Sequence, residues 1–300
     1  MTTRTVIITG ANTGLGLECA RSILARDDAV HVVLAVRNPE LGAKAVAELG
    51  APERCSVIEC DLASLASVGE FIAAFASAPI PPLRAVVCNA GLQMTDTKYT
   101  VDGVEMTFGV NHLGHFALVT GLLDRLVAPA RIVIVASGTH DPAKLTGMPA
   151  PNYTSAEELA HPPTHVPSEG RRRYTASKLC NVLFCYELDR RLGEGAKGVT
   201  VTAFDPGLMP STSLARDYSS SQKLLWRIIT PALRLLPNVN SSTASGARLA
   251  ALAVDEAFEG VSGRYFEGAK DIRSSTDSYD VAKAADLWET SEQLVQHISR

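Results

Sequence analysis

Short apolar runs and amphipathic segments alternate along the whole chain. Runs rich in Val and Ile predict strands at residues 5–9, 31–36, 55–60, 83–88, 131–137, 199–204 and 263–266. Apolar residues at helical spacing predict helices between them, including 39–49, 64–76, 242–254 and 281–298. We therefore predict a single α/β domain over residues 1–300, a doubly wound parallel sheet of Rossmann type with about seven strands and helices on both faces.

A glycine-rich turn follows the first predicted strand. Glycines let the backbone approach a pyrophosphate, and the N–H groups and dipole of the following helix favour its negative charge. The alternative is a tight turn without a ligand, but a strand before and a helix after are what a dinucleotide-binding fingerprint requires. The predicted cofactor-binding residues of this turn are Gly10, Asn12, Thr13, Gly14, Leu15 and Gly16.

Tyr174 and Lys178 form a second motif, on a predicted helix that runs to about Leu192. Side chains four residues apart share one face of a helix. A free tyrosine is a poor acid or base at neutral pH, but a neighbouring cation lowers its pKa. The pair therefore predicts proton transfer to a carbonyl oxygen. Taken alone, an exposed tyrosine beside a solvated lysine is the commoner arrangement.

Composition narrows the class of protein. The formal net charge is −4, which offers no basic surface for nucleic acid. The six cysteines lack CxxC spacing and lie mostly in apolar runs, which predicts buried thiols in a reducing compartment. His112 and His115 have no third ligand in view, so we predict packing or capping for them and no metal site.

The start of the chain leaves no room for a leader peptide, because the first strand begins within a few residues of Met1. No apolar run reaches the roughly 20 residues that a bilayer-spanning helix needs. We therefore predict a cytoplasmic protein with a small-molecule substrate; a homo-oligomer is possible.

The GxxxGxG spacing of the glycine turn and the Tyr174–Lys178 motif, taken together, resemble the short-chain dehydrogenase/reductase family, and the resemblance covers nearly the whole chain. It implies hydride transfer between a nicotinamide cofactor and a substrate. It also implies that Tyr174 protonates the substrate oxygen and Ser137 orients that oxygen. Lys178 would lower the tyrosine pKa and hold the nicotinamide ribose, and Asn111 would support a proton relay.

The resemblance implies further cofactor contacts at other strand ends. From the residues themselves, Asp61 could equally cap a turn before helix 64–76, and Asn89 could tie neighbouring strands through its amide. The implied contacts are Asp61 and Leu62 at the adenine, Asn89, Ala90 and Gly91 in an Asn-Ala-Gly element, and Pro206 and Gly207 beside the nicotinamide.

Arg37 follows the second predicted strand, where NAD-selective relatives carry an acidic residue. A guanidinium suits the 2′-phosphate of NADP(H), so we predict that cofactor and name Arg37 as its selectivity residue. A solvated surface arginine is the alternative.

Two long segments are predicted to cover the substrate. Residues 138–170 leave from Ser137 and return at Tyr174, and connections of this length are usually functional or disordered. Residues 208–240 contain an apolar stretch that suits a bulky hydrophobic substrate, although core packing or weak membrane-surface contact are alternatives. The arginines at 171–173 oppose the helix dipole, which predicts a partner acid nearby if they do not bind a substrate carboxylate.

Within the family, the sequence around Tyr174 is similar to that of the retinol-dehydrogenase and light-dependent protochlorophyllide-reductase branch. The segment Leu287–Val295 looks most like the protochlorophyllide enzymes. Those photoenzymes place a reactive cysteine directly after the Pro-Gly pair, where this chain has Leu208. We therefore predict an NADPH-dependent carbonyl reductase or alcohol dehydrogenase. The alternatives are a C=C reductase and a non-enzymatic NADP(H)-binding protein.

Overall fold

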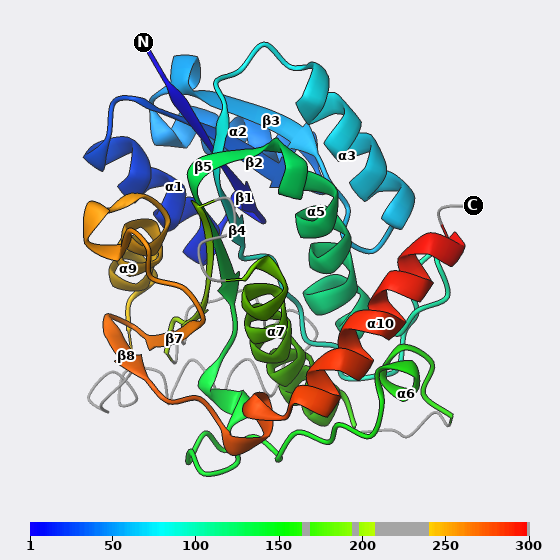
Figure 1. The fold of residues 1–300 in the computed structure, drawn as a ribbon. Coiled ribbons are helices and arrows are strands. Elements are labelled where there is room, and N and C mark those ends of the chain that lie inside the picture. Colours follow the sequence, from blue (N-terminus) through cyan, green and yellow to red (C-terminus); the bar gives the residue numbers. More distant parts are fainter. Residues whose placement is uncertain (164–168, 194–197, 208–239, 299–300) are drawn as a thin grey trace, which may run out of the picture.

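The computed structural model describes residues 1–163, 169–193, 198–207 and 240–298. Its strands are β1 (Arg4–Thr9), β2 (Val30–Val36), β3 (Cys55–Glu59), β4 (Leu83–Cys88), β5 (Leu126–Val135), β6 (Val199–Asp205), β7 (Arg264–Glu267) and β8 (Lys270–Ile272). Among the described residues they form an eight-stranded sheet in the order β3-β2-β1-β4-β5-β6-β7-β8 (Figure 1). Strands β1 to β7 run parallel, and β8 pairs antiparallel with β7.

Helices cover both faces of the sheet (Figure 1). One face carries α1 (Gly14–Arg26), α2 (Pro39–Leu49) and α9 (Ser242–Val254). The other carries α3 (Leu65–Ser77), α5 (Gly114–Leu122) and α7 (Gly170–Leu192). Helix α10 (Val281–Ile298) packs on α7, the short α6 (Ala156–Ala160) packs on α10, and α4 (Met106–Phe108) leads toward α5. The predicted doubly wound α/β fold is therefore confirmed.

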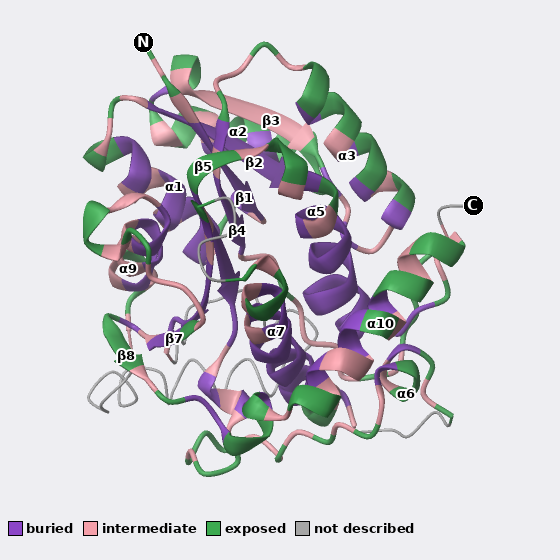
Figure 2. Ribbon diagram, viewed as in Figure 1, coloured by how far each residue is buried: buried purple, intermediate pink, exposed green. Residues whose placement is uncertain are grey.

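Burial on both faces explains the continuous apolar runs of the strands. All seven residues of β2 are buried, as expected for a parallel strand between two helical layers. Figure 2 shows the central strands and the sheet-facing side of α7 as buried, with exposed residues on the outer helices. The two layers of side chains form one apolar cluster on each face of the sheet.

Several predicted elements have the observed bounds, and others needed correction. Residues 39–49, 83–88, 242–254 and 281–298 agree with the structure. The fifth strand was placed at 131–137 but runs from Leu126 to Val135, because Pro129 interrupts its apolar pattern without ending the strand. Strand β8 was missed because it has only three residues, two of them charged. The connection after β5 also contains α6.

The strand order places a topological switch beside β1. Strand β1 pairs with β2 on one side and with β4 on the other, so the chain winds in opposite directions from this point. In such sheets ligands bind at the carboxyl ends of the strands, in the crevice where the winding reverses. The glycine turn after β1 and the Asn89–Gly91 loop after β4 both lie there.

Two further observations concern the cysteines and the helices of the described residues. All six thiols are free; five are buried and Cys55 is half-buried, as predicted for most of them. Within the described ranges, no helix combines the length and apolar character required to cross a membrane.

Candidate active site

The turn after β1 packs directly on the loop after β4. A Cβ added to Gly16 would lie 2.5 Å from Asn89 Nδ2 and 2.6 Å from the Gly10 carbonyl oxygen, so no larger residue fits there without displacement. Asn89 Nδ2 donates to the Thr9 carbonyl oxygen at 2.8 Å. The predicted tie between neighbouring strands is therefore confirmed, and the two loops form one packed edge.

The N-terminus of α1 differs from those of α2, α3 and α9. Asn38, Ser64 and Ser241 each cap a helix by accepting a hydrogen bond from a backbone N–H with the side chain. Thr13, at the same position before α1, makes no such bond. The first N–H groups of α1 are therefore not satisfied by a cap side chain, and such groups form a binding site for an anion such as a phosphate.

Three other predicted cofactor residues lie on neighbouring loops. Arg37 is exposed immediately after β2, and in the described part of the chain no carboxylate pairs with it. Asp61 Oδ1 accepts from the Ala63 amide at 3.0 Å, which confirms that it caps a turn before α3. Leu62 is buried, and its backbone fits closely against Gly114 at the start of α5.

Asn111 lies in a π-helical turn, Gly109–Leu113, between α4 and α5. Single π turns within helices are frequent at functional sites. Asn111 Oδ1 accepts from the Leu92 amide at 2.8 Å. Its Nδ2 donates to the Leu92 carbonyl and to Ser177 Oγ, each at 2.9 Å. A buried amide thus ties the loop after β4 to α7.

Tyr174 and Lys178 lie on α7 as the helical spacing predicts. Both are buried, and Lys178 Nζ is 5.7 Å from the centroid of the Tyr174 ring. Lys178 Nζ donates to the Val135 carbonyl at the end of β5 at 3.1 Å. Asn181 Nδ2 donates to the same carbonyl at 3.0 Å. The lysine is therefore fixed between the helix and the sheet.

Burial lowers the pKa of Lys178 to about 8, and the nearby Asp205 charge acts in the opposite direction. Asp205 is itself buried at the end of β6. Its Oδ1 accepts from the Gly207 amide at 2.9 Å, and its Oδ2 accepts from the Tyr265 hydroxyl at 3.1 Å. An amine with a pKa near neutrality can exchange a proton under physiological conditions, so this site suits acid-base chemistry.

Ser137 follows β5 by two residues rather than ending it, because the strand stops at Val135. Its Oγ accepts from the Thr139 amide at 3.3 Å and so caps the short turn Gly138–His140. A hydroxyl that accepts this bond still has a hydrogen to donate. Ser137 can therefore orient an oxygen of a bound molecule.

Comparison with known proteins gives the family. A family model described as short chain dehydrogenase matches residues 4–156. WW domain-containing oxidoreductase of Danio rerio is 36% identical over 302 residues, which cover 99% of this chain and 69% of that protein. The chain belongs to the short-chain dehydrogenase/reductase family. The fold of this family binds a nicotinamide cofactor, so the chain is an oxidoreductase with a small-molecule substrate.

A second curated relative and a solved structure also cover nearly the whole chain. Protochlorophyllide reductase of Avena sativa is 36% identical over 317 residues, which cover 97% of this chain and 99% of that enzyme. A crystal structure of an uncharacterised protein from Mycobacterium Paratuberculosis has a TM-score of 0.72 and 30% identity, and covers 98% of this chain and 94% of its own. The predicted resemblance to the protochlorophyllide enzymes is confirmed.

Two of the three arginines before Tyr174 have partner acids, as their unfavourable position at a helix start predicted, whereas Arg171 donates to the Gly147 carbonyl. Arg173 Nε lies 3.2 Å from the buried Glu105 Oε1, and Arg172 Nη1 lies 3.7 Å from Glu169 Oε1. Burial raises the pKa of Glu105, although the neighbouring amides and Arg173 counteract that effect. Arg173 therefore pairs with a protein carboxylate and fixes the start of α7 to α4.

The loop after β6 is described only at its beginning. Ser245 Oγ donates to the Pro206 carbonyl at 2.7 Å, and Gly207 adopts a positive φ of 77°. Leu208 and most of the predicted covering segment 208–240 lie outside the described residues. Residues 164–168 of the segment 138–170 also lie outside them.

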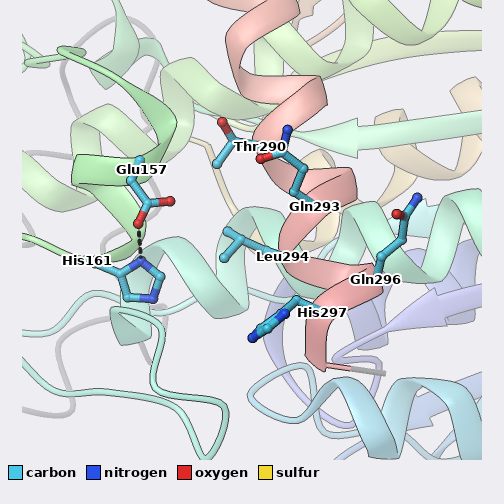
Figure 3. Close-up of a pocket in the computed structure, with 7 residues that line it drawn as sticks. All are labelled: Glu157, His161, Thr290, Gln293, Leu294, Gln296 and His297. Carbon is cyan, nitrogen blue, oxygen red and sulfur yellow. Dashed lines mark hydrogen bonds and ion pairs between the residues drawn. The ribbon is translucent and has the colours of Figure 1, made fainter. Parts of the chain in front are cut away.

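A hollow of about 460 Å³ lies away from these residues, between α6 and the end of α10. Figure 3 shows Glu157 and His161 on one side and Leu294 and His297 on the other. None of the predicted site residues lines it. His161 Nδ1 lies 2.8 Å from Glu157 Oε1, a pair on the surface of α6.

Three polar residues of the site were not singled out by the sequence pattern. Asp205, Ser177 and Asn181 are all buried within this cluster. Asn181 could have been found by its spacing, since it follows Lys178 by three residues on the same helix face. Asp205 could have been found as a carboxylate at the end of an otherwise apolar strand.

Proposed function

We propose that this protein is an NADP(H)-dependent oxidoreductase that transfers hydride between the nicotinamide and the carbonyl or alcohol carbon of a bulky apolar substrate. One observation supports this proposal most strongly. Tyr174, Lys178 and Asn111 converge at the edge of the sheet where the glycine turn leaves the N-terminus of α1 without a cap side chain. An anion site for the cofactor and an acid-base group would therefore face the same crevice.

The residues present fit the cofactor. The close fit of Gly16 keeps side chains out of the turn, and the amides of α1 would hold the pyrophosphate. Asp61 and Leu62 would contact the adenine, Asn89–Gly91 would line the cofactor, and Pro206 and Gly207 would lie beside the nicotinamide. When bound, the nicotinamide supplies or accepts the hydride.

The protein's own residues would move the proton. Tyr174 would give its phenolic proton to the substrate oxygen during reduction, while the Ser137 hydroxyl donates a hydrogen bond to the same oxygen. Lys178, with its pKa lowered to about 8, would stabilise the phenolate and hold the ribose. Asn111 would support the relay that returns a proton from solvent to Lys178.

The preference for NADP(H) is proposed from Arg37. This side chain is exposed after β2, next to the strand end where a ribose would lie. Its planar guanidinium can bind a 2′-phosphate through two hydrogen bonds, whereas the acidic residue of NAD-selective relatives would repel it.

The substrate class and the location of the protein also belong to this proposal. Segments 138–170 and 208–240 would cover the substrate, and the apolar stretch within 208–240 favours a large hydrophobic molecule, such as a retinoid. The similarity to protochlorophyllide reductases favours C=C reduction as a second candidate, although Leu208 replaces the cysteine of the photoenzymes. Six free thiols support a reducing, cytoplasmic environment.

The test is a screen of cofactor consumption with aldehydes, ketones and retinoids, with NADPH and NADH in parallel. Tyr174→Phe should lower kcat about a thousandfold, because the proton donor is lost while the ring and its packing remain. Binding of NADPH, followed by calorimetry, should change little. The exposed Tyr99 gives a matched control, and Tyr99→Phe should retain full activity. Retained turnover in Tyr174→Phe would refute the assignment.

A further inference from the structure

His115 is buried on α5, and the reaction proposed above gives it no role. Its Nδ1 lies 3.1 Å from the Asn111 carbonyl oxygen, and its Nε2 lies 2.9 Å from Thr9 Oγ. Thr9 is the last residue of β1, directly before the glycine turn. The imidazole therefore bridges the residue before the cofactor turn and the asparagine of the predicted proton relay.

The partners fix the tautomer of His115. A carbonyl oxygen can only accept, so Nδ1 must carry the hydrogen of the bond to Asn111. Burial lowers the pKa of His115 to about 4, with a smaller contribution from the Lys178 charge, so the ring is neutral near pH 7 and Nε2 has no hydrogen. Nε2 therefore accepts from the Thr9 hydroxyl.

The Thr9 hydroxyl is then fully used. Its oxygen accepts from the amides of Asn89 and Ala90, each at 2.9 Å. Its hydrogen has two acceptors within reach, His115 Nε2 at 2.9 Å and the Val87 carbonyl at 3.4 Å, and the imidazole is the closer. A hydroxyl offers one donor and two acceptor positions, so all three are satisfied.

These bonds continue to the catalytic helix. Asn111 Nδ2 donates to Ser177 Oγ at 2.9 Å, and Ser177 Oγ donates to the Tyr174 carbonyl at 2.8 Å. A continuous path thus runs from Thr9 through His115, Asn111 and Ser177 to the backbone of Tyr174. In this path, His115 is the link that joins α5 to β1.

We infer that His115 is a positioning residue, which sets the place of Asn111 and Tyr174 relative to the cofactor turn. The inference rests on the proposed function, because it assigns His115 to the same reaction. It predicts that loss of the bridge slows turnover more than it weakens NADPH binding. Asn89 Nδ2 would still hold the loop after β4 to the Thr9 carbonyl. The Thr9 hydroxyl, however, would be held less firmly against the Asn89 and Ala90 amides, and the relay residues would lose their alignment with the cofactor.

His112 provides a matched control, three residues earlier on the same helical segment. It is equally buried, and burial lowers its pKa to about 3. Its Nε2 lies 2.9 Å from Ser291 Oγ on α10, and that hydroxyl donates to the Leu287 carbonyl at 2.6 Å. His112 must therefore donate through Nε2, so the two histidines have opposite tautomers, and His115 contacts β1 whereas His112 contacts α10.

The mutational experiment compares His115→Phe with His112→Phe by kcat, NADPH affinity and unfolding temperature. His115→Phe should lower kcat about 10- to 100-fold, since small misplacements of reacting groups cost that much, while NADPH affinity changes far less. His112→Phe should keep kcat even if its stability falls as much. His115→Gln, which can donate and accept at similar positions, should recover most of the loss. Equal kcat values for the two Phe variants, or no recovery with Gln, would overturn the inference.

Two spectroscopic readouts do not depend on a substrate. Nitrogen-15 spectra of the imidazoles should show His115 protonated at Nδ1 and His112 at Nε2, with no titration between pH 5 and pH 8. The Asn89 and Ala90 amides should exchange with solvent faster in His115→Phe than in His112→Phe. If the wild type turned over no substrate, the proposed function would fail. These two readouts would still show whether His115 forms the bridge between Thr9 and Asn111. An Nε2 proton on His115, or unchanged exchange, would overturn it.

Discussion

The buried polar residues near the strand ends, namely Asn111, Lys178, Asn181 and Asp205, and the residues of the hollow between α6 and α10 are similar side chains in different surroundings. Each has basic groups, a carboxylate and amides. Lys178 is 4% exposed, whereas the side chains of His161 and Glu157 are 42% and 65% exposed. Burial changes the pKa of Lys178, while water screens the pair on α6. A hollow on the surface is therefore a poorer guide to chemistry here than buried polar groups that meet at strand ends.

The largest effect is expected from replacing the buried Lys178 with Met. Turnover should fall about a thousandfold, because the tyrosine loses its cation. The protein without cofactor should at the same time become more stable at pH 7, because a buried charge is removed and Asn181 still satisfies the Val135 carbonyl. Thermal unfolding and kcat of the purified variant test both effects.

The burial of Lys178 should also make stability depend on pH in a defined direction. The pKa of Lys178 is about 8 in the folded chain against an ordinary 10.5, so the unfolded chain binds more protons between these values. The contribution of Lys178 to stability should therefore rise with pH in this window, by up to about 3 kcal/mol, whereas the buried thiols, whose pKa values are raised, act in the opposite direction. In denaturant titrations at pH 7 and pH 10, the stability of the wild type relative to Lys178→Met should show this rise. Its stability relative to Lys44→Met, a control at an exposed site, should not change with pH.

Arg37 tests whether burial is required for a role in this crevice, because it is exposed. Arg37→Asp should lower the ratio of kcat/KM for NADPH to that for NADH about 100-fold, since a charged hydrogen bond to phosphate is replaced by repulsion. Arg125→Asp changes the charge equally at the amino end of β5, far along the strand from the site, and should leave the ratio unchanged. An unchanged ratio in Arg37→Asp would make this residue a solvated arginine.

The smallest effect is expected at the hollow. His161→Ala should change stability by less than about 0.5 kcal/mol, as is usual for exposed positions. Turnover and cofactor selectivity should stay at the wild-type level in the same assays. A loss of turnover as large as that in His115→Phe would show that the hollow belongs to the active site.

The parts of the site that could be predicted are those that depend on residues close together in the sequence. The glycine turn and the Tyr174–Lys178 spacing specify a local backbone and a shared helix face, and both are present in the structure. The observed bounds of α2 agree with the prediction, and its start is local in origin, because Asn38 and Pro39 give an N-terminal signal that needs no tertiary contact.

The parts that could not be predicted depend on contacts between distant segments. Arg173 signalled that an acid must be near, but Glu105, 68 positions earlier by residue number, is found only when α4 and α7 pack together. The bridge from His115 to Thr9 likewise joins residues separated by more than 100 positions. From the sequence alone, the members of such a pair are recognised only as polar residues in apolar surroundings, and the partner of each stays unknown.

The π turn at Gly109–Leu113 also affects how the chain could change length. A π turn holds one residue more than an α-helical turn, so removing one residue there would leave a regular α-helix with both flanking segments in their present orientation. Phe108 and Phe116, which are both buried, would then be seven residues apart, which is close to two α-helical turns, and both could stay in the core. The chain could therefore lose one residue here without repacking the core, and the loss would fall on the place that the turn gives to Asn111.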